Sequence, residues 1–270
     1  MKNKILVSAL VVALVAPPMS AEQQPPRKKK IPLRELMARE LEMSGGYVEK
    51  TGSQKGRIVF LDTQNVYDST NITVALEAYR KNRTARYNFV IENGKLPNST
   101  ETESGYMIAK KQHDADILVV CVADQQTPTF LAAPEEGFAV VNAAKVTAGL
   151  SGGAIEKFGA SRYRKELIRA VCFAAGATGS QFKGNVFSAA KLRDLDECRE
   201  MVPVDTLMKA GQELKLKGVT PSVTSTYETA CEQGWAPAPT SDVQKAIWDK
   251  VHAIPTKPIK IEFDPKTDTK

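Results

Sequence analysis

The sequence predicts an α/β protein built on a mixed, mostly parallel sheet with covering helices and an antiparallel edge strand. Three compact apolar runs, at 57–64, 86–95 and 115–124, are separated by stretches with helical periodicity. This alternation of strands and helices is typical of a parallel sheet. A fourth apolar run, at 134–146, follows a turn and predicts a last strand that runs antiparallel along the edge of the sheet.

The N-terminal residues 1–21 predict a secretory signal peptide. Lys2 and Lys4 precede the apolar run 5–16, and small residues that suit a cleavage site follow it. The run is shorter than the roughly 20 apolar residues of a membrane-spanning helix, so we expect no transmembrane anchor. We therefore expect an exported protein, periplasmic or secreted. Its residues 22–55 are expected to form a tether and a short amphipathic helix, and a glycine-rich loop is expected over Ser44–Gly56.

The elements of the main domain, expected over 56–221, each have a local signal. A helix capped by Ser69-Thr70-Asn71 is expected between the first two strands, and another over Gly105–Gln112. The run 115–124 is apolar on both faces, so Asp116–Ala123 is expected to be the central strand.

A further helix is expected over Ser161–Ala175, with an apolar face that ends at Gly176. Mixed short segments follow it. A C-terminal segment, 222–270, is expected to carry one helix, Asp242–His252, and a tail rich in proline and lysine.

The charge pattern favours no nucleic-acid partner. The net charge of +6 is modest, and part of it lies in the run Arg27–Lys30, which follows two prolines. Such a run indicates either a solvated tether or attraction to an anionic surface.

The four cysteines of an exported protein invite disulfides. Cys198 and Cys231 lie in polar, turn-rich segments, so we expect these two to pair. Cys121 and Cys172 lie in apolar segments and are expected to be buried free thiols.

The segment Arg169–Gly179, RAVCFAAGATG, has the spacing of the zinc motif H-E-x-x-H-x-x-G-x-x-H. Gly176 occupies the place of the motif's glycine. Arg169, Phe173 and Gly179 stand where the three histidines would be, and Ala170 stands where the glutamate would be.

With this helix, the order of the preceding segments resembles the metzincins, most closely the archaemetzincin-type zinc peptidases, over residues of about 57–220. DILVVCVAD resembles the family's central strand, and FLAAPEEGFAVVNAAKV resembles the edge strand that lines its substrate cleft. Met201 or Met208 would take the place of the family's Met-turn. The resemblance implies a metzincin-like fold.

The departures from the motif exclude the zinc chemistry that the resemblance would imply. A metzincin zinc site needs three neutral imidazoles, and this chain has two histidines in all, His113 and His252, neither of them near the motif. The general-base glutamate is also missing. We therefore expect no zinc, no other cofactor and no hydrolysis by the family mechanism.

The first functional hypothesis is a pseudoenzyme that keeps the substrate cleft and binds an extended peptide or a glycoprotein. The cleft is expected between the edge strand and the helix, with five lining residues: Arg169, Phe173, Phe138, Val140 and Asn142. Arg169 would present its guanidinium to an anionic group of the ligand. Alternatively, Glu166 or another carboxylate pairs with Arg169, and Phe173 fills the space of the metal.

Two further hypotheses remain open from the sequence. A secreted hydrolase would use a carboxylate site without zinc, with Asp124, Glu135 and Glu136 as candidate catalytic residues. A structural envelope protein would use the basic tether to dock on an anionic surface.

Overall fold

The computed structural model describes residues 32–63, 67, 69–80, 86–98, 104–177, 179–180 and 182–253, and it divides into two compact units, 1–40 and 41–270. The predicted signal peptide, 1–21, lies outside the described residues. Within the ranges given, we find no helix with the length and apolarity that a bilayer crossing requires. Helix α1 (Leu33–Met43) is the predicted amphipathic helix, and none of its residues is buried.

A five-stranded sheet forms the centre of the second unit, with strand order β3-β2-β4-β6-β5. Every neighbouring pair is parallel except β5 with β6. The central strand falls where the sequence predicts it, and all six of its residues are buried. The strands are β2 (Ile58–Asp62), β3 (Phe89–Asn93), β4 (Ile117–Val122), β5 (Phe130–Ala133) and β6 (Phe138–Asn142).

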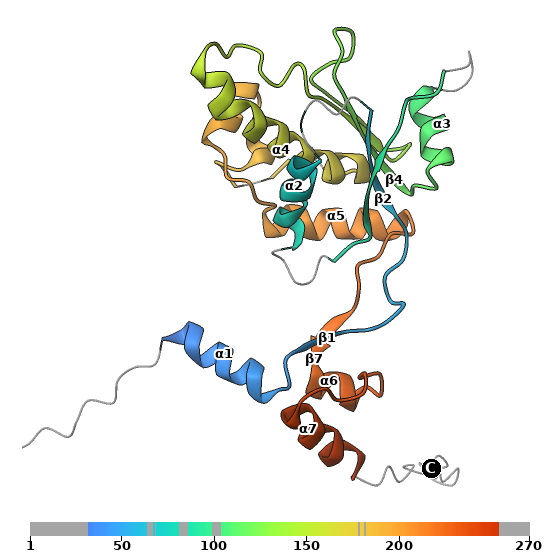
Figure 1. Cartoon of the computed structure of the whole chain (residues 1–270), viewed down its shortest axis with the longest axis vertical. Coiled ribbons are helices and arrows are strands. Elements are labelled where there is room, and N and C mark those ends of the chain that lie inside the picture. The colour runs from blue at the N-terminus through green and yellow to red at the C-terminus, as the bar shows by residue number, and fades with distance from the viewer. Residues whose placement is uncertain are drawn as a thin grey trace, which may run out of the picture. The chain divides into compact units, whose positions relative to one another are not determined.

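The two faces of this sheet carry different layers of helices, as Figure 1 shows. Helices α2 (Thr70–Arg80), α4 (Gly153–Ala175) and α5 (Val204–Leu216) cover one face, and α3 (Gly105–Gln112) covers the other. Because side chains alternate along a strand, odd and even positions of β4 contribute to separate apolar clusters. The mixed α/β fold predicted from the sequence is confirmed.

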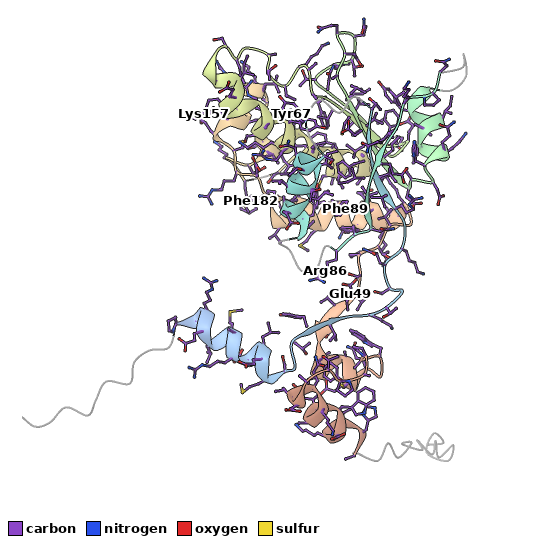
Figure 2. The ribbon with its side chains drawn as sticks, viewed as in Figure 1. Glu49, Tyr67, Arg86, Phe89, Lys157 and Phe182 are labelled. Carbon is purple, nitrogen blue, oxygen red and sulfur yellow. The ribbon has the colours of Figure 1, made fainter. Side chains whose placement is uncertain are left out.

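The larger apolar cluster includes aromatic side chains from β2, α2 and β3. The ring of Phe89, labelled in Figure 2, lies 5.5 Å from the ring of Tyr79 and 6.3 Å from that of Phe60. The Tyr79 hydroxyl, which is buried, donates to the backbone oxygen of Ile168 at 2.5 Å. This bond fixes α2 against α4, the helix that carries the degenerate motif.

The antiparallel edge strand is present, but it is β5 rather than the run at 134–146. Strand β6, within that run, pairs in parallel with β4 on one side and in antiparallel with β5 on the other. All five residues of β6 are buried, whereas those of β5 are half-buried or exposed. A strand that is apolar on both faces belongs inside a sheet, and the shorter, more exposed run Phe130–Ala133 forms the edge.

A second, two-stranded sheet joins β1 (Tyr47–Glu49) to β7 (Thr224–Thr226) in antiparallel register. Helix α6 (Tyr227–Glu232) packs on it and on α7 (Asp242–His252), whose bounds equal the predicted ones. A loop was expected over residues 44–56, so β1 corrects that expectation. The pairing joins the predicted tether segment to the predicted C-terminal segment, and the domain boundaries themselves stay a prediction.

The chain between α4 and β7 is more regular than predicted. Two short 3-10 helices, η1 (Val186–Ser188) and η2 (Leu192–Glu197), precede α5, where only mixed short segments were expected. Helix α5 buries Leu207, Ala210 and Leu214, which share one helical face. Helix α4 also begins at Gly153, eight residues before the predicted start.

Candidate functional site

Helix α4 carries the degenerate zinc motif in its last turns and ends at Gly176. The φ of Gly176 is 106°, and its N–H donates to the backbone oxygens of Cys172 and Phe173. A left-handed residue at this place is the usual way to end a helix, and glycine adopts it without steric cost. The retained glycine of the motif therefore has a structural role as the helix cap.

Arg169 is paired with a carboxylate of its own helix. Its Nη1 donates to both oxygens of Glu166, at 3.0 and 3.1 Å. The side chain of Glu166 is only 3% exposed, and that of Arg169 is 15% exposed. Burial raises the pKa of Glu166, although Arg169 favours the charged form. The ion pair of Arg169 with Glu166, which the sequence analysis gave as an alternative to ligand binding, is therefore present in the structure.

Two aromatic rings enclose the guanidinium of Arg169. Its Cζ lies 5.1 Å from the ring centre of Phe130 on β5 and 5.2 Å from that of Phe173 on α4. The two rings meet edge to face at 5.4 Å, and Phe187 stacks on Phe173. Guanidinium groups gain cation–π energy in such positions. We call Glu166, Arg169, Phe173 and Phe130 the Arg169 stack.

The remaining residues predicted to line the cleft do not join the Arg169 stack. Phe138 and Val140 belong to the apolar cluster on the α3 side of the sheet, away from α4. The side-chain amide of Asn142 donates to the backbone oxygens of Asp124 and Thr127, and its oxygen accepts from Ala144. These three residues are buried because β6 is an interior strand. The expectation that they line a site with Arg169 is therefore corrected.

The strand residue that lies beside Arg169 is Phe130 of β5, and the sequence analysis expected residues of β6 there. It lies in the four-residue run FLAA, at the start of the segment that suggested an edge strand. Its place beside α4 depends on the strand order of the sheet, which the sequence pattern of this run does not give.

The candidate carboxylates for a hydrolase are not brought together. Asp124 follows the C-terminal end of β4, whereas Glu135 and Glu136 lie exposed in the turn before β6. The length of β6 separates the two places, roughly 17 Å for five extended residues. No acid–base pair is formed by these residues.

The carboxylate of Asp124 accepts hydrogen bonds from the loop that follows it. Burial raises its pKa, but hydrogen bonds from the backbone and hydroxyl of Thr127 and the backbone of Gln126 outweigh burial, so the pKa is lowered overall. The carboxylate therefore holds its own turn and stays ionised.

All four cysteines are free thiols, so the expected Cys198–Cys231 disulfide does not form. The thiol of Cys198 donates to the backbone oxygens of Asn185 and Asp194, while Cys231 packs in the cluster of α6 and α7. Cys121 and Cys172 are buried free thiols, as predicted, and burial raises the pKa of each to about 12. Neither is a nucleophile at neutral pH.

A cavity of about 820 Å³ lies beside η2, and no residue of the Arg169 stack lines it. Side chains of both charges line it, among them Lys183, Arg193 and Glu197, together with Cys198. Burial raises the pKa of the Cys198 thiol, which keeps it protonated at neutral pH. Neither the charges nor the thiol select a ligand class.

The donor set at the motif does not fit zinc. Arg169 carries a permanent cation, and Phe173 and Gly179 offer no ligand atom. His113 binds Glu92, and His252 stacks on Trp248 of α7. Among the described residues, no group of three or more His, Cys, Asp or Glu side chains is arranged for a metal ion. The two methionines considered for the Met-turn, Met201 and Met208, are exposed.

We predict that the segment Arg169–Gly179 binds no zinc. Protein purified without a histidine tag should contain strongly substoichiometric zinc by elemental analysis, before and after incubation with zinc sulfate and dialysis. The reason is the lack of neutral nitrogen, thiolate or carboxylate ligands at the motif. One zinc per chain, removable by EDTA, would contradict this prediction.

Comparison with protein-family models finds no match, and no curated protein matches the chain. Solved structures that are similar include archaemetzincin from Methanopyrus kandleri, with 13% identity and a TM-score of 0.45, covering 61% of this chain and 98% of that one. A zinc-dependent peptidase from Methanocorpusculum labreanum has 14% identity and a TM-score of 0.41, covering 57% of this chain and 100% of that one. These two structures carry the names of the type of protein that the sequence resembles, an archaemetzincin and a zinc-dependent peptidase.

Proposed function

We propose that this protein is an exported, metzincin-like pseudoenzyme that binds an extended polypeptide by strand addition at β5. The observation that carries the proposal is the Arg169 stack, in which two residues at histidine positions of the zinc motif, Arg169 and Phe173, pack against Phe130 of the edge strand β5. Export is supported by the N-terminal sequence, with its basic start, apolar run and small residues.

The outer edge of β5 offers backbone groups to a partner strand. The N–H of Asn142 donates to the oxygen of Thr129 at 2.9 Å, which makes these two a hydrogen-bonded pair. Such pairs alternate along an antiparallel ladder, so in the observed register the N–H and C=O groups of Phe130 and Ala132 point away from β6. Leu131, between them, is 39% exposed. Unpaired groups of this kind are what an extended peptide uses to add a strand.

On the face of the sheet that α4 covers, side chains of a bound peptide would contact well-packed residues of the protein. Phe130 and Ala132 pack there against the main apolar cluster, and Phe173, which stacks on the buried ring of Phe187, supports Phe130. The turn after β5 is also held, because Lys217 donates to the backbone oxygen of Pro134 at 2.8 Å. The edge strand is therefore fixed before a ligand arrives, which lowers the entropy lost on binding.

Proline at position 132 should weaken peptide binding. Proline removes the outward N–H of Ala132, which β6 does not use, so the fold should persist while the partner strand loses a hydrogen bond. We expect the affinity for fluorescein-labelled random dodecapeptides, measured by fluorescence anisotropy, to fall at least about tenfold.

Ala132→Val is the matched control, because valine suits a strand and keeps the N–H. Thermal unfolding should show that both variants fold. Equal binding by Ala132→Pro and wild type would contradict strand addition, and no peptide binding by the wild type would overturn the proposed function.

A further inference from the structure

One side of the Arg169 guanidinium has no partner. The group has five N–H donors, and only Nη1 is used, toward Glu166. Nε is buried without a hydrogen-bond partner. The hydrogen bonds of this guanidinium with described residues are those of Nη1, so Nη2 makes none with them. Nε and Nη2 lie on the same edge of the guanidinium, the edge that meets the two oxygens of a carboxylate side by side.

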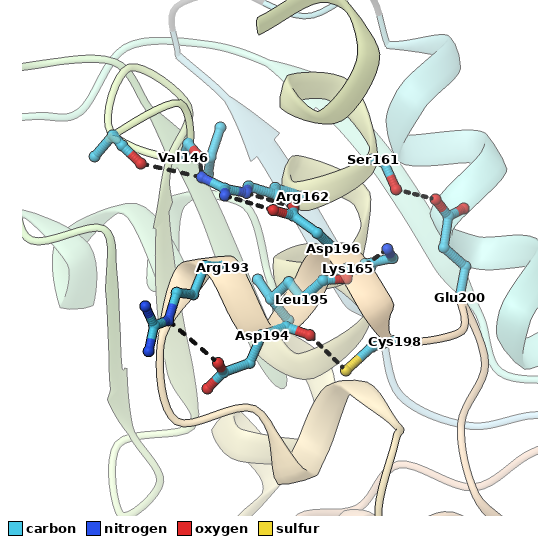
Figure 3. Close-up of polar contacts among 11 residues, drawn as sticks. Val146, Ser161, Arg162, Lys165, Arg193, Asp194, Leu195, Asp196, Cys198 and Glu200 are labelled. Atoms are coloured by element: carbon cyan, nitrogen blue, oxygen red, sulfur yellow. Dashed lines mark hydrogen bonds and ion pairs between the residues drawn. The ribbon is translucent and has the colours of Figure 1, made fainter. Parts of the chain in front are cut away.

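Two other arginines of α4 use that edge within the protein. Arg162 donates from Nε and Nη2 to Asp196, both at 2.7 Å, as Figure 3 shows. Arg164 donates from the same two atoms to Glu200, at 3.0 and 2.8 Å. Arg162 and Arg164 thus each bind a carboxylate of the protein through Nε and Nη2, and Arg169 does not.

The unused edge lies close to the proposed peptide site. Phe130 is one of the two β5 residues with outward backbone groups, and its ring lies 5.1 Å from the Arg169 Cζ. A strand added to β5 would run about 4.8 Å farther out, with alternate side chains on the helix side beside Phe130. A carboxylate on such a side chain, or at the end of the peptide, would approach Arg169 from this side, and it would have to displace the side chains that shield Nε from solvent.

We infer that Arg169 receives a carboxylate of the bound peptide through its Nε and Nη2, so that the ligand class is an acidic extended peptide. This inference rests on the proposed function, and it names the ligand group that the β5 edge alone does not select. Both an Asp or Glu side chain and a C-terminal carboxylate have the required pair of oxygens. Glu166 does not compete for this edge, since it uses Nη1.

Three labelled peptides of one apolar core sequence test the inference. The first is neutral with an amidated C-terminus, the second carries one Glu and the amide, and the third has no Glu and a free C-terminus. We expect wild type to bind at least one carboxylate peptide about tenfold more tightly than the neutral peptide, by fluorescence anisotropy. The carboxylate peptide with the higher affinity shows whether a Glu side chain or the C-terminus supplies the carboxylate. Equal affinity for all three peptides would overturn the inference while leaving strand addition intact.

Arg169→Lys is the diagnostic variant. Lysine keeps the positive charge beside Glu166 but lacks the paired donors of the guanidinium edge. The preference for the carboxylate peptide should fall to about twofold or less, with the affinity for the neutral peptide unchanged. Arg164→Lys is the matched control and should keep the wild-type preference, because its edge already holds Glu200. An unchanged preference in Arg169→Lys would overturn the inference. Binding of none of the peptides would instead overturn the proposed function.

Discussion

Replacing Arg169 with alanine is expected to lower the free energy of unfolding by about 3–5 kcal/mol. The change removes the cation beside Glu166, whose side chain is 3% exposed, and leaves a buried carboxylate with no other hydrogen bond among the described residues. It also removes the group held between Phe130 and Phe173. Chemical denaturation at neutral pH measures the loss.

A double variant separates the buried charge from general damage to the core. Glu166→Leu with Arg169→Met replaces the pair by apolar side chains of similar volume, and such replacements are often neutral or stabilising. We expect the double variant to recover most of the stability lost by Arg169→Ala. A loss below about 1 kcal/mol in Arg169→Ala would show that Glu166 does not depend on Arg169.

A large loss of stability in Arg169→Ala does not exclude a ligand at Arg169. The ion pair with Glu166 and the proposed ligand contact use different nitrogen atoms. Nη1 pairs with Glu166, whereas Nε and Nη2 have no partner among the described residues. Alanine removes both roles together. Lysine is therefore the informative substitution for binding, and alanine is the informative one for stability.

The parts of the fold that the sequence predicts best are those with a long, regular pattern. The run at 115–124 is apolar at consecutive positions, which requires burial on both faces, and it forms the central strand. Helices α3 and α7 have the predicted bounds, because serine residues at 104 and 241 cap them and accept a hydrogen bond from the third helical N–H.

The elements that were missed have short or glycine-containing patterns. Strand β5 has four residues between a polar segment and Pro134, too few for a clear alternation. The first turns of α4 contain Gly153 and Gly159, which favour a loop by propensity. The structure explains Gly159, since a Cβ there would lie 3.0 Å from the Tyr67 hydroxyl and 3.1 Å from Thr147. Tertiary packing selects glycine at that position.

The site was predictable only within one helix. Arg169 and Phe173 are four residues apart on α4, so their shared face follows from the helical period, and Glu166 is one turn before Arg169. Phe130 is distant in sequence and reaches the site only because β5 turns back along β6. Sequence periodicity does not determine such a contact, which depends on strand order.

Arg162→Ala is expected to cost as much stability as Arg169→Ala, about 3–5 kcal/mol. The side chain of Arg162 is 3% exposed and links α4 to η2 through Asp196 (Figure 3). Its Nη1 also donates to the backbone oxygens of Val146 and Ala148, at 3.2 and 3.0 Å. Its removal leaves one carboxylate and two carbonyls without their donor. Arg164→Ala is the matched control on the same helix, since Arg164 is 22% exposed, and it should cost about 1 kcal/mol.

The Arg162 pair should also give part of the protein's stability a dependence on pH. The hydrogen bond from Arg162 is the largest influence on Asp196 and lowers its pKa, so the folded state favours the ionised carboxylate. The resulting stability is complete above the unfolded pKa of about 4, and it is lost as the pH falls through the lower, folded pKa. Denaturation curves from pH 7 to pH 2 should therefore show the gap between wild type and Arg162→Ala narrowing below about pH 4. A gap that stays constant over this range would show that Arg162 stabilises the fold through the two carbonyl groups and packing, and that its pairing with Asp196 contributes little.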